Sequence, residues 1–286
     1  MTNLFPPFDP DETPRLRGMR QLRSIPLRAL FPSLVTLLAL CAGLTSIRMS
    51  VELRFDAAIA AITIAAFLDG IDGRLARFLK STSRFGAELD SLTDFVNFGV
   101  APAVLLYVWT LDDLRSLGWI AALIFAICCA LRLARFNVAL DDEHPEWQSN
   151  YFTGAPAPAG AMIVLLPIYL EFVAIPHGFL TAPVVLVYTI AIGLLMVSRL
   201  PTWSGKLVGR RIPRDMVMPL FVLVVLFAAL LLSFPFETLA ICSLLYLACL
   251  PLAWRGYQQH LAADKAAAAE AAEAATESPV PEGKIE

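Results

Sequence analysis

The sequence predicts an all-α membrane protein that crosses the bilayer several times. Hydrophobic residues make up 58% of the 286 residues and charged residues only 16%, whereas a soluble domain carries about 25% charged residues. The mean hydropathy is +0.67. Apolar runs of about 20 residues, the length that spans a bilayer, recur along the chain.

Eight apolar runs are predicted transmembrane helices. The first begins too far along the chain, and is followed by too many others, to be a cleaved signal peptide. The last two are joined closely around Pro235, so six or seven spans are alternatives to eight. The predicted spans cover about residues 30–47, 57–78, 90–110, 117–138, 157–175, 180–198, 216–234 and 236–254.

The positive charges predict the orientation of these spans. With eight spans, Arg48, Arg54 and Arg115 lie on one side of the bilayer, and the remainder of the 22 Lys and Arg residues lie on the other side with both chain ends. Because cytoplasmic loops carry the excess of Lys and Arg, we expect both ends to be cytosolic.

Three segments follow from this reading. Residues 1–28 are an Arg-rich cytosolic segment that either sets the topology or lies against anionic lipid headgroups. Residues 29–255 are the transmembrane unit, and residues 256–286 are a cytosolic Ala/Glu-rich tail, expected to be a frayed helix that is partly disordered.

Net charge and cysteine content argue against other classes of protein. A net charge of -3 gives no support to a nucleic-acid partner. The five cysteines lie in apolar stretches without the spacing of a zinc site. We expect them to be small buried hydrophobic residues rather than disulfides or metal ligands.

Four aspartates mark the strongest candidate site. Asp69 and Asp72 are three residues apart, and Asp90 and Asp94 are four apart, so each pair shares one helix face. The two pairs lie near the cytosolic ends of successive spans. Because only a short segment links these spans, we expect them to be antiparallel neighbours. Charged residues inside spans are costly and indicate function. Four converging carboxylates predict a divalent cation with oxygen ligands, hence Mg²⁺, Mn²⁺ or Ca²⁺ rather than zinc.

Small residues accompany these aspartates. Gly73 and Gly86 each lie close to an Asp pair and leave room for a phosphate-bearing ligand to approach the backbone. Ala76 is small, and Arg77 is available to a phosphate or to a carboxylate. The alternative is a pair of helices with solvated charged ends, which two phased Asp pairs beside glycines disfavour.

These residues resemble the signature of the CDP-alcohol phosphatidyltransferase family at all eight fixed positions. The resemblance implies a six-helix core, usually in a homodimer, with two Mg²⁺ or Mn²⁺ ions. It implies metal ligands at Asp69, Asp72, Asp90 and Asp94, with Asp94 also the general base. It implies CDP-diacylglycerol binding by Gly73, Ala76, Arg77 and Gly86.

Further stretches, at residues 91–103, 131–138 and 151–161, are similar to the bacterial integral-membrane branch of the family that uses serine. This similarity implies transfer of the phosphatidyl group from CDP-diacylglycerol to L-serine, with release of CMP. It also implies the bacterial inner membrane and a cytosolic active site.

Three polar residues are candidates for binding serine. Arg132 and Arg135 share a face at the cytosolic end of the fourth span, and Asn97 lies one turn beyond Asp94. The alternative for the two arginines is a topology-setting charge or a lipid-phosphate contact. The run at 153–161 either shapes the acceptor pocket or forms a kinked helix entry.

The sequence leaves open other acceptor alcohols and another class of protein, an ion-coupled transporter. Glycerol 3-phosphate or inositol phosphate would need a denser cluster of cations, and choline would need an aromatic cage, for which Phe95, Phe98 and Phe136 are candidates. An ion-coupled transporter would need repeat symmetry and a matching second half, which the sequence lacks.

Overall fold

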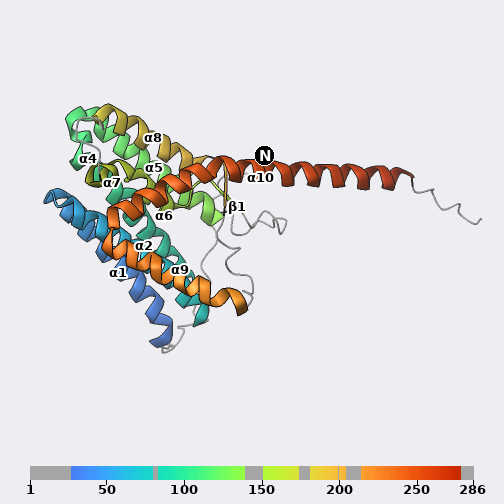
Figure 1. Ribbon diagram of the computed structural model, residues 1–286, viewed down its shortest axis with the longest axis horizontal. Coiled ribbons are helices and arrows are strands. Elements are labelled where there is room, and N and C mark those ends of the chain that lie inside the picture. Colours follow the sequence, from blue (N-terminus) through green and yellow to red (C-terminus); the bar gives the residue numbers. More distant parts are fainter. Residues whose placement is uncertain are drawn as a thin grey trace, which may run out of the picture.

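The structure is a computed structural model that describes residues 27–79, 83–138, 151–173, 181–198, 200–203 and 214–277. It confirms an all-α membrane protein, with one pair of three-residue strands among the described residues (Figure 1). In order, the elements are α1 (Leu27–Val51), α2 (Phe55–Phe78), α3 (Arg84–Asp94), the π-helix η1 (Phe95–Val100), α4 (Ala101–Trp109), the 3₁₀-helix η2 (Leu111–Leu114), α5 (Ser116–Val138), β1 (Tyr151–Thr153), α6 (Ala157–Val164), α7 (Leu166–Val173), α8 (Ala182–Val197), β2 (Pro201–Trp203), α9 (Arg214–Ser233) and α10 (Pro235–Glu277).

Within the described residues, each of the eight predicted spans contains helix, but the helices are less uniform than predicted. Within the described residues, five helical segments are long and apolar enough to cross a membrane: Phe31–Val51, Phe85–Trp109, Ser116–Val138, Met216–Ser233 and Pro235–Gln259. The helix α2 falls outside this set because it carries charged residues at both ends. The helix α8 is apolar but shorter.

The predicted span 157–175 is broken at Leu165 into α6 and α7. The cause is Pro167, which has no N–H to donate to the carbonyl of Ile163 four residues earlier. The hydroxyl of Tyr188, on α8, donates to that carbonyl at 2.7 Å. A neighbouring helix thus satisfies the freed backbone group, as the interior of a membrane protein requires.

The predicted span 90–110 is a composite of α3, η1 and α4. The wide π turn precedes Pro102, and the N–H of Ala101 donates to the carbonyl of Val96, five residues back. Single π turns are frequent at functional sites. Here the turn follows immediately after Asp94, so it sets the direction of the helix beyond the candidate site.

The strands β1 and β2 pair antiparallel and join the segments that follow α5 and α8. The run at 153–161 forms the entry to α6. Gly154 has a φ of +78°, and a side chain there would collide with the carbonyl oxygen of Met196. The Thr202 hydroxyl donates to the Gly154 carbonyl at 2.9 Å.

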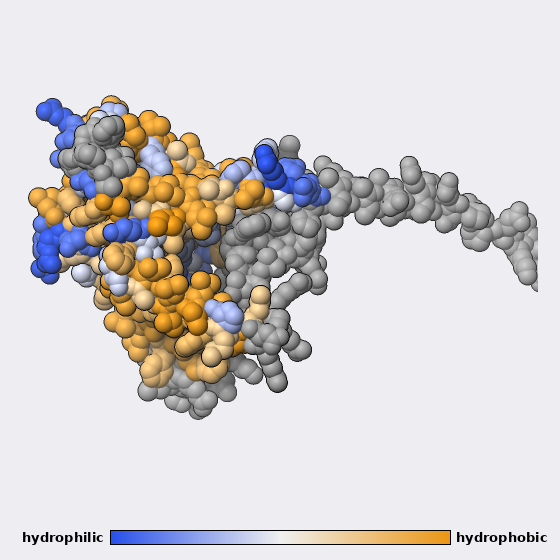
Figure 2. Space-filling model, in the orientation of Figure 1, coloured by the Kyte–Doolittle hydropathy of each residue, from blue (hydrophilic) through white to orange (hydrophobic). Residues whose placement is uncertain are grey.

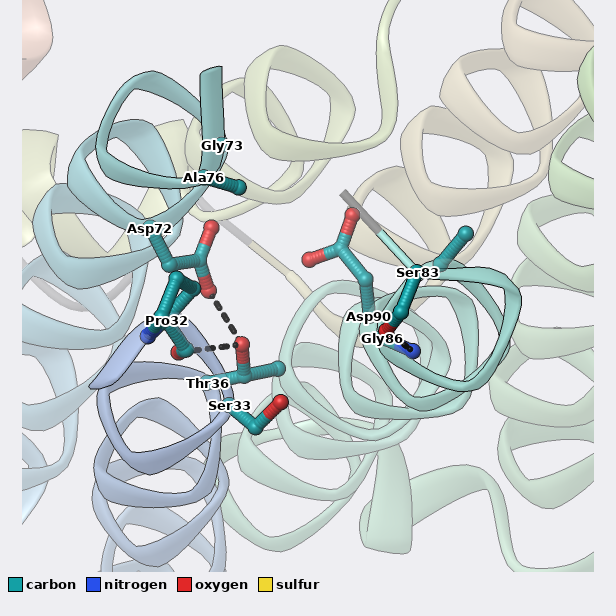
Figure 3. A pocket seen from close by; sticks show the side chains of 10 residues that line it. Pro32, Ser33, Thr36, Asp72, Gly73, Ala76, Ser83, Gly86 and Asp90 are labelled. Atoms are coloured by element: carbon teal, nitrogen blue, oxygen red, sulfur yellow. Dashed lines mark hydrogen bonds between the residues drawn. The ribbon is translucent and has the colours of Figure 1, made fainter. Parts of the chain in front are cut away.

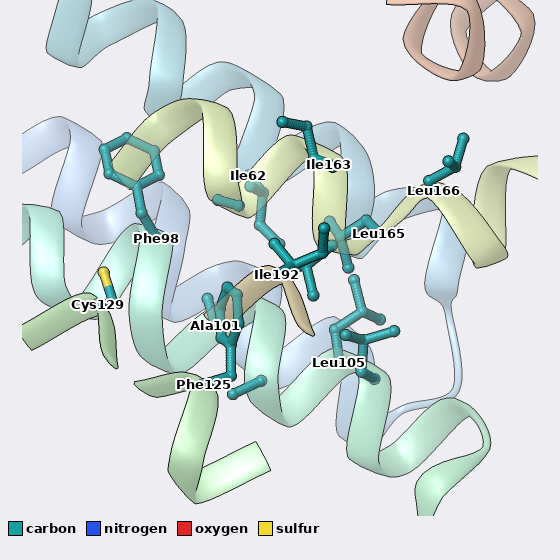
Figure 4. Packing of buried hydrophobic residues seen from close by; sticks show 14 of the residues in the cluster. Ile62, Phe98, Ala101, Leu105, Phe125, Cys129, Ile163, Leu165, Leu166 and Ile192 are labelled. Carbon is teal, nitrogen blue, oxygen red and sulfur yellow. The ribbon is translucent and has the colours of Figure 1, made fainter. Parts of the chain in front are cut away.

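The core lies between α2, η1, α4, α5, α6, α7 and α8. Ile62, Phe98, Leu105, Phe125 and Ile192 are buried there and pack together (Figure 4). Helix α1 packs along α2, and α5 packs along α8.

Much of the face shown in Figure 2 is apolar, as a bilayer requires, and many large hydrophobic side chains of the described residues are exposed. The window of α9 that could span a membrane is not buried at all. The expectation of buried cysteines holds for Cys128 and Cys129 but is wrong for Cys41 and Cys242, whose side chains are exposed. The physical reason is that apolar side chains on outer helix faces need lipid rather than protein around them.

The chain ends are described in part. Residues 1–26 of the predicted Arg-rich segment lie outside the described residues. At the other end, α10 continues through the Ala/Glu-rich part to Glu277 and extends beyond the bundle (Figure 1). Residues 278–286 lie outside the described residues.

Candidate active site

The structure brings three of the four aspartates together. Carboxylate oxygens of Asp69, Asp72 and Asp90 all lie within 4.8 Å of one another. Two of these residues come from α2 and the third from α3, so both helices build the cluster. Three carboxylates this close repel one another strongly, since water screens charges poorly in partly buried sites. A cation is the ordinary means of holding such a group together.

Asp94 adjoins this cluster. Its carboxyl group interacts electrostatically with Asp69, Asp72 and Asp90. One buried oxygen of Asp94 and one of Asp90 make no hydrogen bond within the described residues. Buried carboxylate oxygens without donors are costly, and this donor set fits a hard divalent cation.

A cavity of about 180 Å³ opens beside the carboxylates, and Asp72 and Asp90 face it from opposite sides (Figure 3). Gly73, Ala76 and Gly86 line it as well. A side chain at Gly73 would meet nothing within 4 Å. At Gly86 it would meet the hydroxyl of Ser83, which caps α3 by accepting from the Gly86 N–H at 3.0 Å.

Helix α1 contributes a side chain that the sequence did not single out. The Thr36 hydroxyl lies 2.8 Å from Asp72 Oδ2 and 3.0 Å from the Pro32 carbonyl oxygen (Figure 3). Thr36 and Asp72 are each 4% exposed. A hydroxyl has one proton, and a carboxylate is the stronger acceptor. Thr36 therefore fixes the orientation of the Asp72 carboxylate.

Arg77 lies close to this cavity on the exposed side of α2. Its Nε donates to the Gly73 carbonyl at 3.1 Å. The guanidinium group keeps further donors that this single bond does not use. It is thus placed where a phosphate bound beside Gly73 would meet a cation.

The three residues predicted to bind serine have different surroundings. Arg132 is buried at 8% exposure and interacts electrostatically with Asp94. Asn97 is fully buried in η1, and a side chain at Gly43 of α1 would collide with its Oδ1. Arg135 donates to the carbonyls of Val197 at 2.8 Å and Ser198 at 3.2 Å, so it holds the C-terminal end of α8.

Comparison with known protein families agrees with this geometry. The model of the CDP-alcohol phosphatidyltransferase family matches residues 29–192, more than half of the chain. The chain belongs to the CDP-alcohol phosphatidyltransferase family. A second model, CDP-alcohol phosphatidyltransferase 2, matches residues 215–251. The two matches thus cover both α2 and α3, which hold the aspartates, nearly all of α9 and the first part of α10.

Several curated relatives in this family carry the name CDP-diacylglycerol–serine O-phosphatidyltransferase. The chain is 42% identical to the protein from Mycobacterium leprae over 238 residues, which are 82% of this chain and 77% of the relative. It is 39% identical to the protein from Mycobacterium tuberculosis, over 82% of each chain. It is 34% identical to the protein from Helicobacter pylori, over 76% of this chain and 88% of the relative.

Reasoning from the sequence missed Thr36 and Ser33 of α1, both of which line the cavity. The available signal was a pair of hydroxyl residues, Ser33 and Thr36, in the first turns of the span after Pro32. Helical spacing orders residues within one helix, however, and gives no means of matching α1 to α2 across the bundle.

Proposed function

We propose that this CDP-alcohol phosphatidyltransferase transfers the phosphatidyl group from CDP-diacylglycerol to L-serine, giving phosphatidylserine and CMP. The observation that carries the proposal is the cluster of Asp69, Asp72 and Asp90, whose carboxylate oxygens lie within 4.8 Å of one another beside a cavity. The names of the relatives indicate the acceptor, since the match with this chain extends over most of the length of each relative.

We propose Mg²⁺ or Mn²⁺ as the cofactor, two ions in all, with Asp69, Asp72, Asp90 and Asp94 as ligands. When bound, two such ions neutralise the attacking and leaving oxygens of an in-line phosphoryl transfer. The buried oxygens of Asp90 and Asp94 that lack hydrogen bonds support this ligand set. Thr36 supports it too, because it holds the Asp72 carboxylate toward the cavity.

The cavity beside the carboxylates suits the CDP head of the lipid substrate. Gly73, Ala76 and Gly86 present little side-chain volume there, so the diphosphate approaches the backbone closely. Arg77, anchored to the Gly73 carbonyl, provides a cation for a phosphate oxygen. The acyl chains stay in the bilayer, because the site opens at the end of membrane-spanning helices.

The proton of the serine hydroxyl goes to Asp94 in this proposal. The serine oxygen forms a bond to the β-phosphorus, the bond from that phosphorus to the CMP oxygen breaks, and CMP leaves with the electron pair. Asp94 interacts electrostatically with Asp69, a proposed metal ligand, and with Arg132, a proposed serine-binding residue. A neutral alcohol is a poor nucleophile, which is why a positioned base is needed.

Serine itself needs a cation for its carboxylate. We propose Arg132 for this role, because it is buried and its Nε makes no hydrogen bond within the described residues. Asn97, whose side-chain nitrogen and oxygen are also buried without hydrogen bonds, adds polar contacts. Arg135 is a poorer candidate than the sequence indicates, because the α8 carbonyls engage its guanidinium group.

We also propose that the protein lies in the bacterial inner membrane, with its ends and active site in the cytosol, and works as a homodimer. The orientation rests on the distribution of Lys and Arg, and the homodimer on the family resemblance. The three proposed segments are residues 1–28, the catalytic unit 29–255 and the tail 256–286.

Choline is the acceptor that the structure disfavours. Of the three phenylalanines considered for an aromatic cage, Phe98 is fully buried in the apolar core. Phe136 lies under the guanidinium group of Arg132, 5.7 Å from ring centroid to Cζ. A ring that already faces a cation is poorly placed to bind a second one.

An acceptor screen tests the proposed function. The purified full-length protein receives CDP-diacylglycerol, Mn²⁺ or Mg²⁺, and one alcohol at a time, with CMP release as the measurement. We expect release with L-serine and only background with glycerol 3-phosphate, inositol phosphate or choline. Release that depends on another alcohol and not on serine would contradict the assignment of the acceptor.

A further inference from the structure

A polar cavity lies at the end of the bundle opposite the aspartates. Its volume is about 420 Å³, and it lies where α4 ends and α5 begins. Asp90 lies near the start, and Tyr107 near the end, of the helical segment Phe85–Trp109, which is long enough to cross a membrane. Tyr107 lines this cavity and Asp90 lines the other one. The cavity is therefore separate from the proposed active site.

One cation and one carboxylate line this cavity without pairing. Arg115 and Asp112 are both exposed, and neither takes part in an ion pair among the described residues. The Tyr107 hydroxyl donates to Asp112 Oδ1 at 2.8 Å, and no hydrogen bond within the described residues engages Oδ2. Ser116, which also lines the cavity, is the first residue of α5, and the N-terminal end of a helix favours an anion. The cavity thus has a positive side and a negative side.

The turn between η2 and α5 holds Arg115 in a strained backbone conformation. Its φ is +48° and its ψ is -119°, a combination that glycine adopts readily and other residues adopt rarely. Helix α5 packs so closely on η2 that a side chain at Gly118 would collide with the Leu111 carbonyl oxygen. Close packing therefore fixes the turn. Strain that the surrounding structure maintains is a feature of functional sites.

Apolar and aromatic side chains place this cavity at the bilayer surface. Leu117, Trp119 and Ile120 are exposed on α5, which is long and apolar enough to cross a membrane. The rings of Trp119 and Tyr107 meet edge to face, with centroids 5.2 Å apart, and both residues line the cavity. Tyrosine and tryptophan are enriched at the depth of the lipid headgroups. A lipid headgroup can therefore enter the cavity while its acyl chains lie along the exposed face of α5.

We propose that this cavity binds a zwitterionic phospholipid whose headgroup carries a phosphate and a primary ammonium group. Arg115 and the N-terminal end of α5 bind the phosphate. Asp112 accepts hydrogen bonds from the ammonium group, and the rings of Tyr107 and Trp119 attract the same cation. An anionic lipid without an ammonium group is disfavoured, because Asp112 repels it. The inference does not depend on the proposed function, and in the proposed orientation the lipid belongs to the outer leaflet.

Lipid titration of the purified full-length protein in detergent tests the proposal. The probe is phosphatidylethanolamine, and the lipid-bound fraction, measured by native mass spectrometry, gives the Kd. We expect Arg115→Gln and Asp112→Asn each to raise this Kd about 10-fold, the lower end of the effect of losing a hydrogen bond to a charged group. The matched controls are Arg54→Gln and Asp113→Asn, which remove exposed charges that do not line the cavity and should keep the wild-type Kd.

Two further ligands identify which part of the lipid is recognised. Phosphatidylglycerol lacks the ammonium group, so Asp112→Asn should bind it at least as tightly as the wild-type protein does; a general loss of folding would weaken both lipids instead. Glycerophosphoethanolamine has the same headgroup without acyl chains, and it should not displace the lipid at equal concentration. Three results would overturn the inference: the same Kd in Arg115→Gln as in Arg54→Gln, equal weakening of both lipids in Asp112→Asn, or displacement by the soluble headgroup.

Discussion

The hydrogen bond from Thr36 to Asp72 offers the sharpest test of how the carboxylates are held. In Thr36→Val the side chain keeps its branched shape but loses the donor that lies 2.8 Å from Asp72 Oδ2. A hydrogen bond to a charged group contributes about 1.5–3 kcal/mol. At about 1.4 kcal/mol for each factor of ten, this predicts a loss of roughly 10- to 100-fold in cation binding. Because both residues are 4% exposed, water is a poor substitute for the lost donor.

The assay is CMP release at saturating CDP-diacylglycerol and serine, measured as a function of Mn²⁺ concentration. We expect the half-saturating Mn²⁺ concentration to rise by the factor given above, and Thr36→Ser to restore most of the affinity. Thr45→Val, on the same helix, is the matched control, because the Thr45 hydroxyl is exposed and donates to the Cys41 carbonyl of its own helix, at 2.7 Å. A wild-type Mn²⁺ dependence in Thr36→Val would refute the claim that this hydroxyl orients a metal ligand.

Three further predictions concern the metal, the base and the topology. Chelation by EDTA should abolish CMP release and added Mn²⁺ or Mg²⁺ should restore it, since the clustered carboxylates need a cation; full activity in a rigorously metal-free preparation would contradict this. Asp94→Asn should lower kcat by about 10²–10⁴-fold, the usual cost of losing a general base, and leave CDP-diacylglycerol affinity largely intact. Asp69→Asn should weaken that affinity, and equal losses in both variants would make Asp94 chiefly a metal ligand. In spheroplasts of a cysteine-free variant, single cysteines at positions 80 and 206 should label only after permeabilisation and one at position 52 from outside; external labelling at position 80 would reverse the orientation.

Spacing within a helix predicted much of the candidate site. Asp69 and Asp72, and then Asp90 and Asp94, could be assigned to shared faces because the α-helix repeats every 3.6 residues. The short link between the two helices then made the pairs neighbours. The structure brings together Asp69, Asp72 and Asp90, and Asp94 interacts electrostatically with Asp69. The roles of these residues in metal binding and proton transfer stay predictions.

Contacts between helices distant in sequence could not be predicted in the same way. The bond from Thr36 to Asp72 joins residues 36 positions apart, and the bond from Tyr188 to the Ile163 carbonyl joins residues 25 positions apart. Hydropathy also treats a run of apolar residues as one span, although Pro167 breaks the helix there and Pro102 follows a π turn. Both prolines are visible in the sequence, but the groups that compensate for them are not.

The charges of the site explain why an arginine is buried so close to the carboxylates. Serine brings a carboxylate of its own toward Asp94, and like charges at short range in a poorly solvated site repel strongly. In the proposed function, a buried cation beside that carboxylate reduces the repulsion, and Arg132 interacts electrostatically with Asp94. An alcohol without a carboxylate makes no ion pair with this cation, so Asp94 and the Phe136 ring offset the cost of burying the guanidinium group without a contribution from the acceptor. In the proposed function, the same residue that permits serine to approach the aspartates therefore also selects for it.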